Sequence, residues 1–111
     1  MSYTYEEPKV ITKSEFMDIV RTGDVSQICD AVVRAVHFIH DYDWLLQQYT
    51  LLLKHADVEV RGATVTCIGH LARMNEIADK NQLLEALKPL LLEEELSGRI
   101  DDAIDDINTF L

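Results

Sequence analysis

The sequence predicts an all-α domain: a short α-solenoid of three antiparallel helix pairs, with about six helices in its 111 residues. Three observations lead to this prediction. Apolar residues recur every three or four positions in successive segments, polar capping and turn residues separate the segments, and no segment is long. Residues 57–73 have the clearest pattern, and we expect the other helices to pack around them in a single domain.

The N-terminal part predicts a helix pair. Residues 1–11 are expected to be an extended lead-in, because Pro8 disfavours helix before it. Thr12 and Glu15 fit a capping box at the start of a short helix, which ends at Gly23 in the left-handed conformation. Asp24 caps a second helix that runs to about residue 40. The residues that the first helix is expected to bury are Phe16, Met17, Ile19 and Val20, and those of the second are Ile28, Val32, Ala35, Val36 and Ile39.

The middle part predicts the second pair. Asp41 or Asp43 caps a third helix over 44–55, which is apolar almost all round and is therefore expected in the middle of the domain. The fourth helix, 57–73, opens on an acidic cap. Its apolar side holds Val60, Thr64, Cys67, Ile68 and Leu71, and its other side holds Gly62, Thr66, Gly69 and Arg73. The second side is expected to form the floor of a groove, although close helix packing is the favoured explanation for Gly69.

The C-terminal part predicts the third pair. After a connection at 74–79, a fifth helix covers about 80–94, and Pro89 is expected to kink it or to end its first part near Lys88. Ser97 is the predicted cap of a sixth helix over 99–110. Its apolar face holds Ile100, Ala103, Ile104, Ile107 and Leu111.

The charge is unusual. Twenty Asp and Glu stand against ten Lys and Arg, for a net charge of -10. This argues against binding nucleic acid or an anionic membrane surface, and it suits either solubility or a basic protein partner. We expect Cys29 and Cys67 to be buried free thiols. The sequence shows neither a signal peptide nor a membrane span, so a cytoplasmic protein that is monomeric when free is expected.

Residues 57–73 resemble a HEAT-type repeat of HEAT-like and armadillo-like proteins. The second helix of such a repeat tends to begin Asp-x-x-Val-Arg and to end with an aliphatic residue, Gly, any residue and Leu. The matching residues here are Asp57, Val60, Arg61, Ile68, Gly69 and Leu71, with Thr64 where Ala is usual. The flanking pairs lack the Val-Arg start. The resemblance implies a right-handed stack whose second helices line a concave face, and it implies no reaction.

A short, acidic, HEAT-like chain also resembles small immunity proteins that are encoded beside bacterial toxins. Size, charge and repeat type carry this resemblance, without a specific motif. It implies a non-enzymatic inhibitor that binds a sibling toxin, often a basic nuclease, and covers its active site. The alternatives are a HEAT-like adaptor or scaffold for another cellular protein, and a lyase-like protein or chaperone for a tetrapyrrole cofactor. The polar stripe of the second helix speaks against the last.

Two groups of residues are candidates for partner binding. The first is an acidic run near the C-terminus, which is either an interface with Lys and Arg or a solvated terminal face. Its members are Glu93, Glu94, Glu95, Asp101, Asp102, Asp105 and Asp106. The second is a polar stripe on the second helix together with one residue of the fourth. Its members, some of which also fit ordinary surface pairs four positions apart, are Asp30, Arg34, His37, Asp41 and Arg73.

No pattern points to catalysis, a metal or a cofactor. His37 and His40 precede two carboxylates, but neither a Cys-x-x-Cys pair nor a His-Glu-x-x-His motif accompanies them. Helix capping explains Asp41 and Asp43. We therefore expect no metal site, no cofactor and no enzymatic activity, and we expect a protein-binding module.

Overall fold

The computed structural model describes residues 9–74 and 77–111, and within these residues it contains helices and turns but no strand. Six α-helices are present, which confirms the predicted fold class. They are α1 (Lys13–Thr22), α2 (Val25–Phe38), α3 (Tyr42–Leu52), α4 (Val58–Met74), α5 (Lys80–Leu87) and α6 (Ser97–Phe110). Two short 3₁₀ turns, η1 (Lys88–Leu90) and η2 (Glu94–Leu96), connect α5 to α6.

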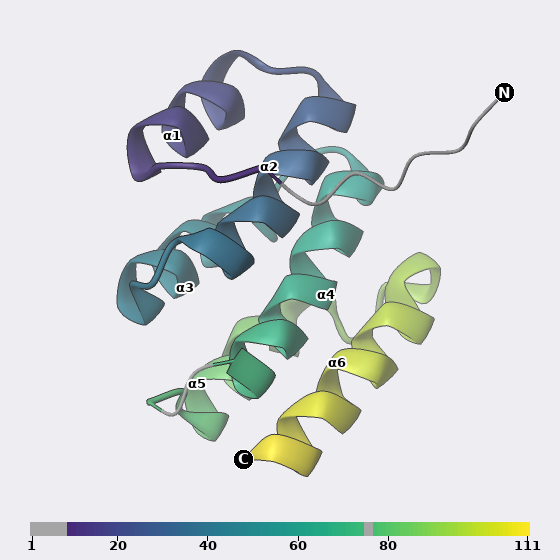
Figure 1. Ribbon diagram of the computed structural model, residues 1–111. Coiled ribbons are helices and arrows are strands. Elements are labelled where there is room, and N and C mark those ends of the chain that lie inside the picture. The colour runs from purple at the N-terminus through teal and green to yellow at the C-terminus, as the bar shows by residue number, and fades with distance from the viewer. Residues whose placement is uncertain (1–8, 75–76) are drawn as a thin grey trace, which may run out of the picture.

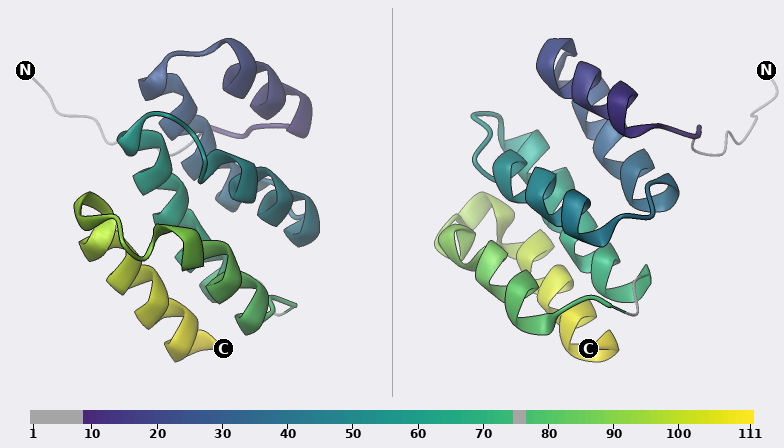
Figure 2. Two further views of the ribbon diagram at one scale, coloured as in Figure 1. Left: turned by 180° about the vertical axis from the view of Figure 1, so that it is seen from behind. Right: turned by 90° about the vertical axis from the view of Figure 1, so that its left-hand side faces the viewer.

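The helices form two layers. In Figure 1, α2, α4 and α6 lie side by side, with α3 and α5 behind them. Figure 2 shows each of these three helices beside the helix that precedes it, so that three pairs are stacked. α4 is the central helix, because it packs against α2, α3, α5 and α6. We call the surface formed by α2, α4 and α6 the second-helix face.

The predicted core side of α4 is confirmed. All five of its residues have no exposed surface: Val60, Thr64, Cys67, Ile68 and Leu71. The buried hydroxyl of Thr64 donates a hydrogen bond to the Val60 carbonyl at 2.8 Å, so that its burial leaves no unpaired donor. Asp57 accepts a hydrogen bond from the Glu59 amide at 2.8 Å and so satisfies a free N–H at the start of the helix.

The opposite side of α4 is covered by α6. A Cβ atom on Gly69 would lie 3.0 Å from the Cα atom of Ala103, and one on Gly62 would lie 3.0 Å from Cδ of Arg99. The expected close packing at Gly69 is thus confirmed. The expectation that Gly62 forms part of the open floor of a groove is wrong, because the Arg99 side chain of α6 lies against this glycine and it is buried.

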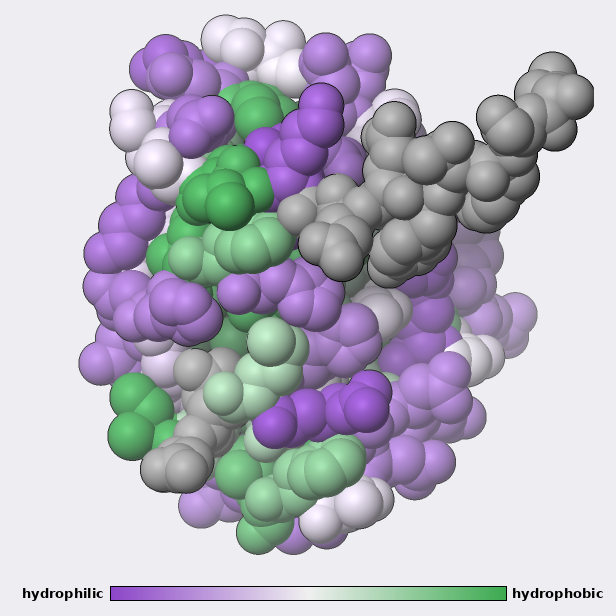
Figure 3. Space-filling model, viewed as in Figure 1, coloured by the Kyte–Doolittle hydropathy of each residue, from purple (hydrophilic) through white to green (hydrophobic). Residues whose placement is uncertain are grey.

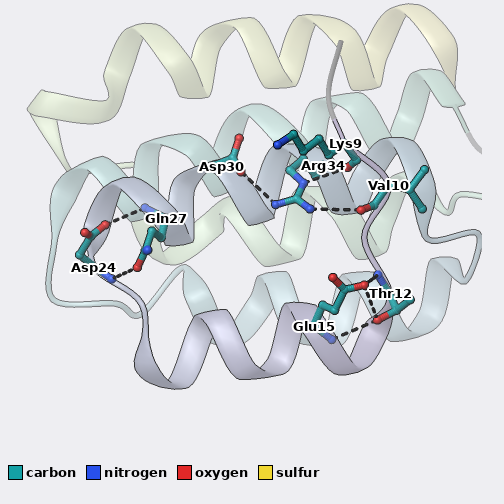
Figure 4. A network of polar contacts seen from close by, with 8 residues as sticks. All are labelled: Lys9, Val10, Thr12, Glu15, Asp24, Gln27, Asp30 and Arg34. Atoms are coloured by element: carbon teal, nitrogen blue, oxygen red, sulfur yellow. Dashed lines mark hydrogen bonds and ion pairs between the residues drawn. The ribbon is translucent and has the colours of Figure 1, made fainter. Parts of the chain in front are cut away.

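The predicted starts of α1 and α2 are confirmed. Both helices begin with complete capping boxes, formed by Thr12 with Glu15 and by Asp24 with Gln27 (Figure 4). The left-handed conformation predicted for Gly23 is wrong, since its φ and ψ are -77° and 162°. Glycine is required there for space, because a Cβ atom would lie 2.6 Å from the carbonyl oxygen of Ile19.

The segment ahead of α1 can be assessed only in part, because residues 1–8 lie outside the described residues. Residues 9–11 are not helical, in agreement with the expected lead-in. Ile11 is 2% exposed and belongs to the core beside Phe16. Met17 was expected in this core but is 44% exposed, because the helix turns it outward.

α3 differs from the prediction in extent and in position. It covers Tyr42–Leu52 rather than 44–55, and the side chain of Asp41 caps it by accepting a hydrogen bond from the Trp44 amide. Leu51 is 59% exposed, so α3 has one side in solvent and is not the central helix. Its apolar residues belong to an outer layer, and the central place belongs to α4. The second helix is also slightly shorter than predicted and ends at Phe38.

The C-terminal third confirms the effect of Pro89. α5 ends at Leu87, and Pro89 follows in the 3₁₀ turn η1, because proline lacks the N–H that a continuing helix needs. The predicted cap at Ser97 is wrong, since α6 already begins at this residue and has no side-chain cap. Of the predicted connection at 74–79, residues 75 and 76 lie outside the described residues.

Candidate functional site

The acidic run near the C-terminus divides into residues with structural contacts and residues without them. Glu93 forms an ion pair with Arg61 at 2.8 Å, and half-buried Asp106 lies against Gly69. The other five are exposed and form no ion pair within residues 9–74 and 77–111: Glu94, Glu95, Asp101, Asp102 and Asp105. We call these five the acidic surface. Two of the five precede α6, and the other three lie on it.

Arg61 explains why Glu93 is not free. Its guanidinium donates to the carbonyls of His55 and Ala56, at 2.8 and 3.0 Å, as well as to Glu93. The loop before α4 is thereby fixed to the turn before α6, although 32 residues separate the two partners. Glu93 is therefore assigned to the stability of the stack rather than to a free surface.

Arg34 has a similar structural role at the other end. Figure 4 shows its guanidinium between α2 and the segment that leads into α1. It donates to the carbonyls of Lys9 and Val10, at 2.9 and 3.1 Å, and to Asp30 at 3.1 Å. The Arg34 side chain is only 15% exposed. The predicted surface pair is thus present, but its arginine is an anchor for the N-terminal segment.

Asp41 is occupied as well. Its carboxylate caps α3 and forms an ion pair with Lys13 of α1. The hydrogen bond from Lys13, followed by that from the Trp44 amide, holds the pKa of Asp41 below its usual value. Lys13 also lies over the Trp44 ring, 5.2 Å from its centre. These contacts fix α1 to α3 and leave the Asp41 carboxylate already paired.

The second-helix face is crossed by Arg99. This residue of α6 extends over Gly62 and donates a hydrogen bond to the Thr66 hydroxyl at 3.1 Å. The thiol of Cys29, on α2, lies close enough to Arg99 for that charge to influence its pKa. Burial first, and then the negative charges of Glu59 and Asp57, raise the pKa of its thiol. The N-terminal half of the face is therefore polar and of mixed charge.

The C-terminal half of the face contains a hollow of about 370 Å³. All three helices of the face contribute to it, and its lining residues are His37, His70, Arg73, Met74 and Phe110. The guanidinium of Arg73 lies over the Phe110 ring, 5.5 Å from its centre. Near these helix ends, Figure 3 shows hydrophobic and strongly hydrophilic side chains in direct contact. We call this site the hollow.

The charge of the hollow comes mainly from Arg73. Burial lowers the pKa of His70, and the positive charge of Arg73 lowers it further, while Asp106 acts in the opposite direction. His70 is therefore neutral at pH 7. Its Nδ1 atom is buried and has no hydrogen-bond partner among the described residues. Asp106 is the carboxylate that acts on this site from α6.

The structure brings together only some of the predicted partner-binding residues. His37 and Arg73 meet in the hollow, and the acidic surface stays free, whereas Asp30, Arg34 and Asp41 are held in other contacts. His70, Arg99 and Phe110 were not predicted. Helical periodicity could have identified His70, because positions 66, 70 and 73 share one side of α4. The packing of α6 against α4, which brings in Arg99 and Phe110, cannot be predicted from this periodicity.

The described residues offer few groups for metal or redox chemistry. Residues 9–74 and 77–111 contain no group of three or more His, Cys, Asp and Glu side chains placed to hold a metal ion. The two cysteines are free thiols; Cys67 is buried and Cys29 half-buried. Burial raises the pKa of Cys67 to about 12, so this thiol stays protonated. In the same parts of the chain, no helix has the length and apolar character to span a membrane.

Comparisons with known proteins show a similarity to a solved structure. No protein-family model and no curated protein matches the sequence. Among solved structures, the chain is similar to one chain of the crystal structure of a CDI (contact-dependent inhibition) complex from Cupriavidus taiwanensis LMG 19424. The TM-score is 0.87 and the sequence identity 26%, and the similarity covers 98% of each chain. The whole arrangement of helices is therefore shared with that protein, while a HEAT family assignment is not supported by these comparisons.

Proposed function

We propose that this chain is an immunity protein that binds a toxin domain and blocks it without catalysing a reaction. The similarity to a chain of a CDI complex supports this proposal, because it extends over the full length of both chains and combines a TM-score of 0.87 with 26% identity. Size, net charge of -10 and helical architecture agree with the same role. An inhibitor of this kind acts in a one-to-one complex by covering the active site or substrate path of its target.

The acidic surface is the proposed first contact with the toxin. Its five carboxylates are exposed and unpaired within the described residues, so they are available to Lys and Arg of a partner. The partial positive charge at the N-terminus of α6 stabilises Glu94 and Glu95, which precede it. Asp105 lies in the second half of α6, where that charge no longer helps. Asp is a poor helix former, so Asp105 lowers the stability of the helix. This unfavourable contribution favours a binding role over a purely structural one.

The mechanism that follows is electrostatic steering and then occlusion. Opposite potentials on the two surfaces increase the rate of encounter by about 10- to 1000-fold at low ionic strength. If the target is a nuclease, its basic substrate path binds phosphates, and the carboxylates of the acidic surface would occupy the same positions. The inhibitor then prevents substrate entry without entering the reaction itself.

Charge reversal tests this assignment. The variant Asp102→Lys/Asp105→Lys is compared with the wild type in binding to a toxin domain from a gene adjacent to that of this chain, by surface plasmon resonance at low and high salt. A control with the same change in net charge is Asp18→Lys/Glu85→Lys, which reverses two exposed carboxylates outside the acidic surface, on α1 and α5. We expect Asp102→Lys/Asp105→Lys to associate at least about 10-fold more slowly at low salt, with the difference shrinking at high salt.

Two results would contradict the proposal in different ways. Association of Asp102→Lys/Asp105→Lys at the wild-type rate would remove the acidic surface from the interface. Failure of the wild type to bind or inhibit the toxin domain would remove the immunity role itself. Retention of another cellular protein in its place would favour the adaptor function.

A further inference from the structure

The hollow contains an exposed arginine of the second-helix face, Arg73. Arg73 is exposed and forms no ion pair within the described residues. By contrast, Arg21, Arg34 and Arg61 are each paired with a carboxylate. Arg99 also has no carboxylate partner among the described residues, but it donates a hydrogen bond to the Thr66 hydroxyl. In a chain with a net charge of -10, an unpaired arginine among so many acids is unexpected. Its surroundings show what kind of group it fits.

The position of Arg73 is defined by neighbours from two helices. Its guanidinium lies over the ring of Phe110, at 5.5 Å from the centre, so that α6 supports a side chain of α4. A guanidinium held on an aromatic face keeps its edge free, and that edge offers parallel N–H donors. The hydrogen-bonding complement of this edge is a planar carboxylate or a phosphate.

The rest of the lining favours a side chain over a free ion. Met74 and Phe110 give the hollow apolar surface, and its volume of about 370 Å³ is far larger than a single small anion requires. Exposed His37 of α2 also lines the hollow, and its ring packs edge-on against Phe38 with 6.4 Å between centres. A side chain with an apolar stem and a carboxylate tip matches this combination of apolar and polar lining residues.

The acidic neighbours limit the strength of the site without removing its selectivity. Asp106 faces the same region from α6, and the C-terminal ends of α2, α4 and α6 carry partial negative charge. These groups make the hollow unsuitable for a highly charged phosphate. A single carboxylate adds less negative charge than a phosphate, and its two oxygens match the parallel N–H donors of Arg73.

We propose that the hollow receives an acidic side chain, Asp or Glu, of the bound toxin domain, and that Arg73 is its counter-ion. This inference rests on the proposed function and adds to it the chemistry of a second contact. The acidic surface attracts basic groups of the partner, and the hollow accepts a group of the opposite sign. In the other contacts this chain supplies the acid and the toxin the base, whereas at Arg73 the two roles are exchanged. This exchange fixes the orientation of the complex, because a rotated partner would place like charges together.

The test compares three arginine variants in binding to the toxin domain. Arg73→Gln removes the charge, Arg73→Lys keeps the charge but removes the planar fork, and Arg21→Gln on α1 is the control with the same change in net charge. We expect Arg73→Gln to weaken binding about 10-fold, mainly through faster dissociation, and Arg73→Lys to weaken it about 3-fold. Arg21→Gln should change affinity less than about 2-fold. Thermal unfolding of each variant verifies that the fold is intact.

A double-mutant cycle identifies the partner group. Each acidic residue of the toxin domain is changed to its amide in combination with Arg73→Gln, and we expect one of them to lose its effect in the variant background. Wild-type binding by Arg73→Gln, or the absence of any coupled acidic residue, overturns this inference while the immunity role stands. Failure of the wild type to bind at all overturns both.

Discussion

The contact between α4 and α6 makes opposite predictions for two glycines of one helix. Gly69→Ala places a Cβ atom 3.0 Å from the Cα atom of Ala103, and the backbone of α6 must move to accommodate it. Gly62→Ala places the same atom 3.0 Å from the side chain of Arg99, which can rotate away into solvent. The two variants therefore differ in whether the new Cβ atom meets a rigid backbone, at Gly69, or a movable side chain, at Gly62.

The expected magnitudes follow from this difference. Replacing glycine by alanine inside a helix stabilises it by about 1 kcal/mol. At Gly69 the forced separation of two helices costs about 2 kcal/mol, which leaves a net loss of about 1 kcal/mol. At Gly62 the displaced Arg99 loses its exposed hydrogen bond to Thr66, worth about 0.5 kcal/mol, so that a net gain of about 0.5 kcal/mol remains.

Thermal and urea unfolding measure this difference directly. The two variants should differ by about 1.5 kcal/mol, or about 6 °C in melting temperature for a domain of this size. Gly98→Ala is a control, since a Cβ atom there meets nothing within 4 Å. The packing account would be refuted if Gly69→Ala were as stable as Gly62→Ala.

Three further predictions concern charged residues. Arg61→Ala leaves Glu93 and two loop carbonyls without their donor, and urea unfolding should show a loss of about 2–3 kcal/mol in the free energy of unfolding. An unchanged midpoint would contradict the structural role of Arg61. NMR titration should give His70 a pKa below its usual value, and Arg73→Gln should raise it because a repelling charge is removed. In the wild type, the pKa of His70 is lower in the folded chain than in the unfolded chain, so the unfolded chain binds a proton at His70 more readily. The free energy of unfolding should therefore decline as the pH falls below about 6.5. Lys13→Met should raise the pKa of Asp41, and no change would exclude the ion pair as the cause of its low value.

The sequence was sufficient where neighbouring residues decide the structure. The capping boxes at Thr12 and Asp24 involve partners three positions away, and Pro89 ends its helix by its own covalent structure. The buried side of α4 was also predictable, because a spacing of three and four positions reports one side of a helix. Each of these features depends on local geometry, which the order of residues encodes directly.

The features that were missed depend on contacts between distant residues. Gly23 is constrained by the Ile19 carbonyl in an extended conformation, which cannot be distinguished from a left-handed end in the sequence. Arg34 fitted an ordinary surface pair and Arg61 was identified only as part of the repeat motif, but their structural partners lie 25 and 32 positions away. The hollow needs the ends of three helices, and only their packing brings Arg73 to Phe110. Charge composition therefore predicted an acidic protein without indicating where an arginine would stay unpaired.

The central claim is that this chain neutralises a toxin by binding it. The most direct measurement is the activity of a toxin domain from a gene adjacent to that of this chain, titrated with the purified wild-type protein. We predict complete inhibition at one equivalent, a stable one-to-one complex, and weaker inhibition by Asp102→Lys/Asp105→Lys at low salt. Full toxin activity in the presence of excess wild-type protein would contradict the claim.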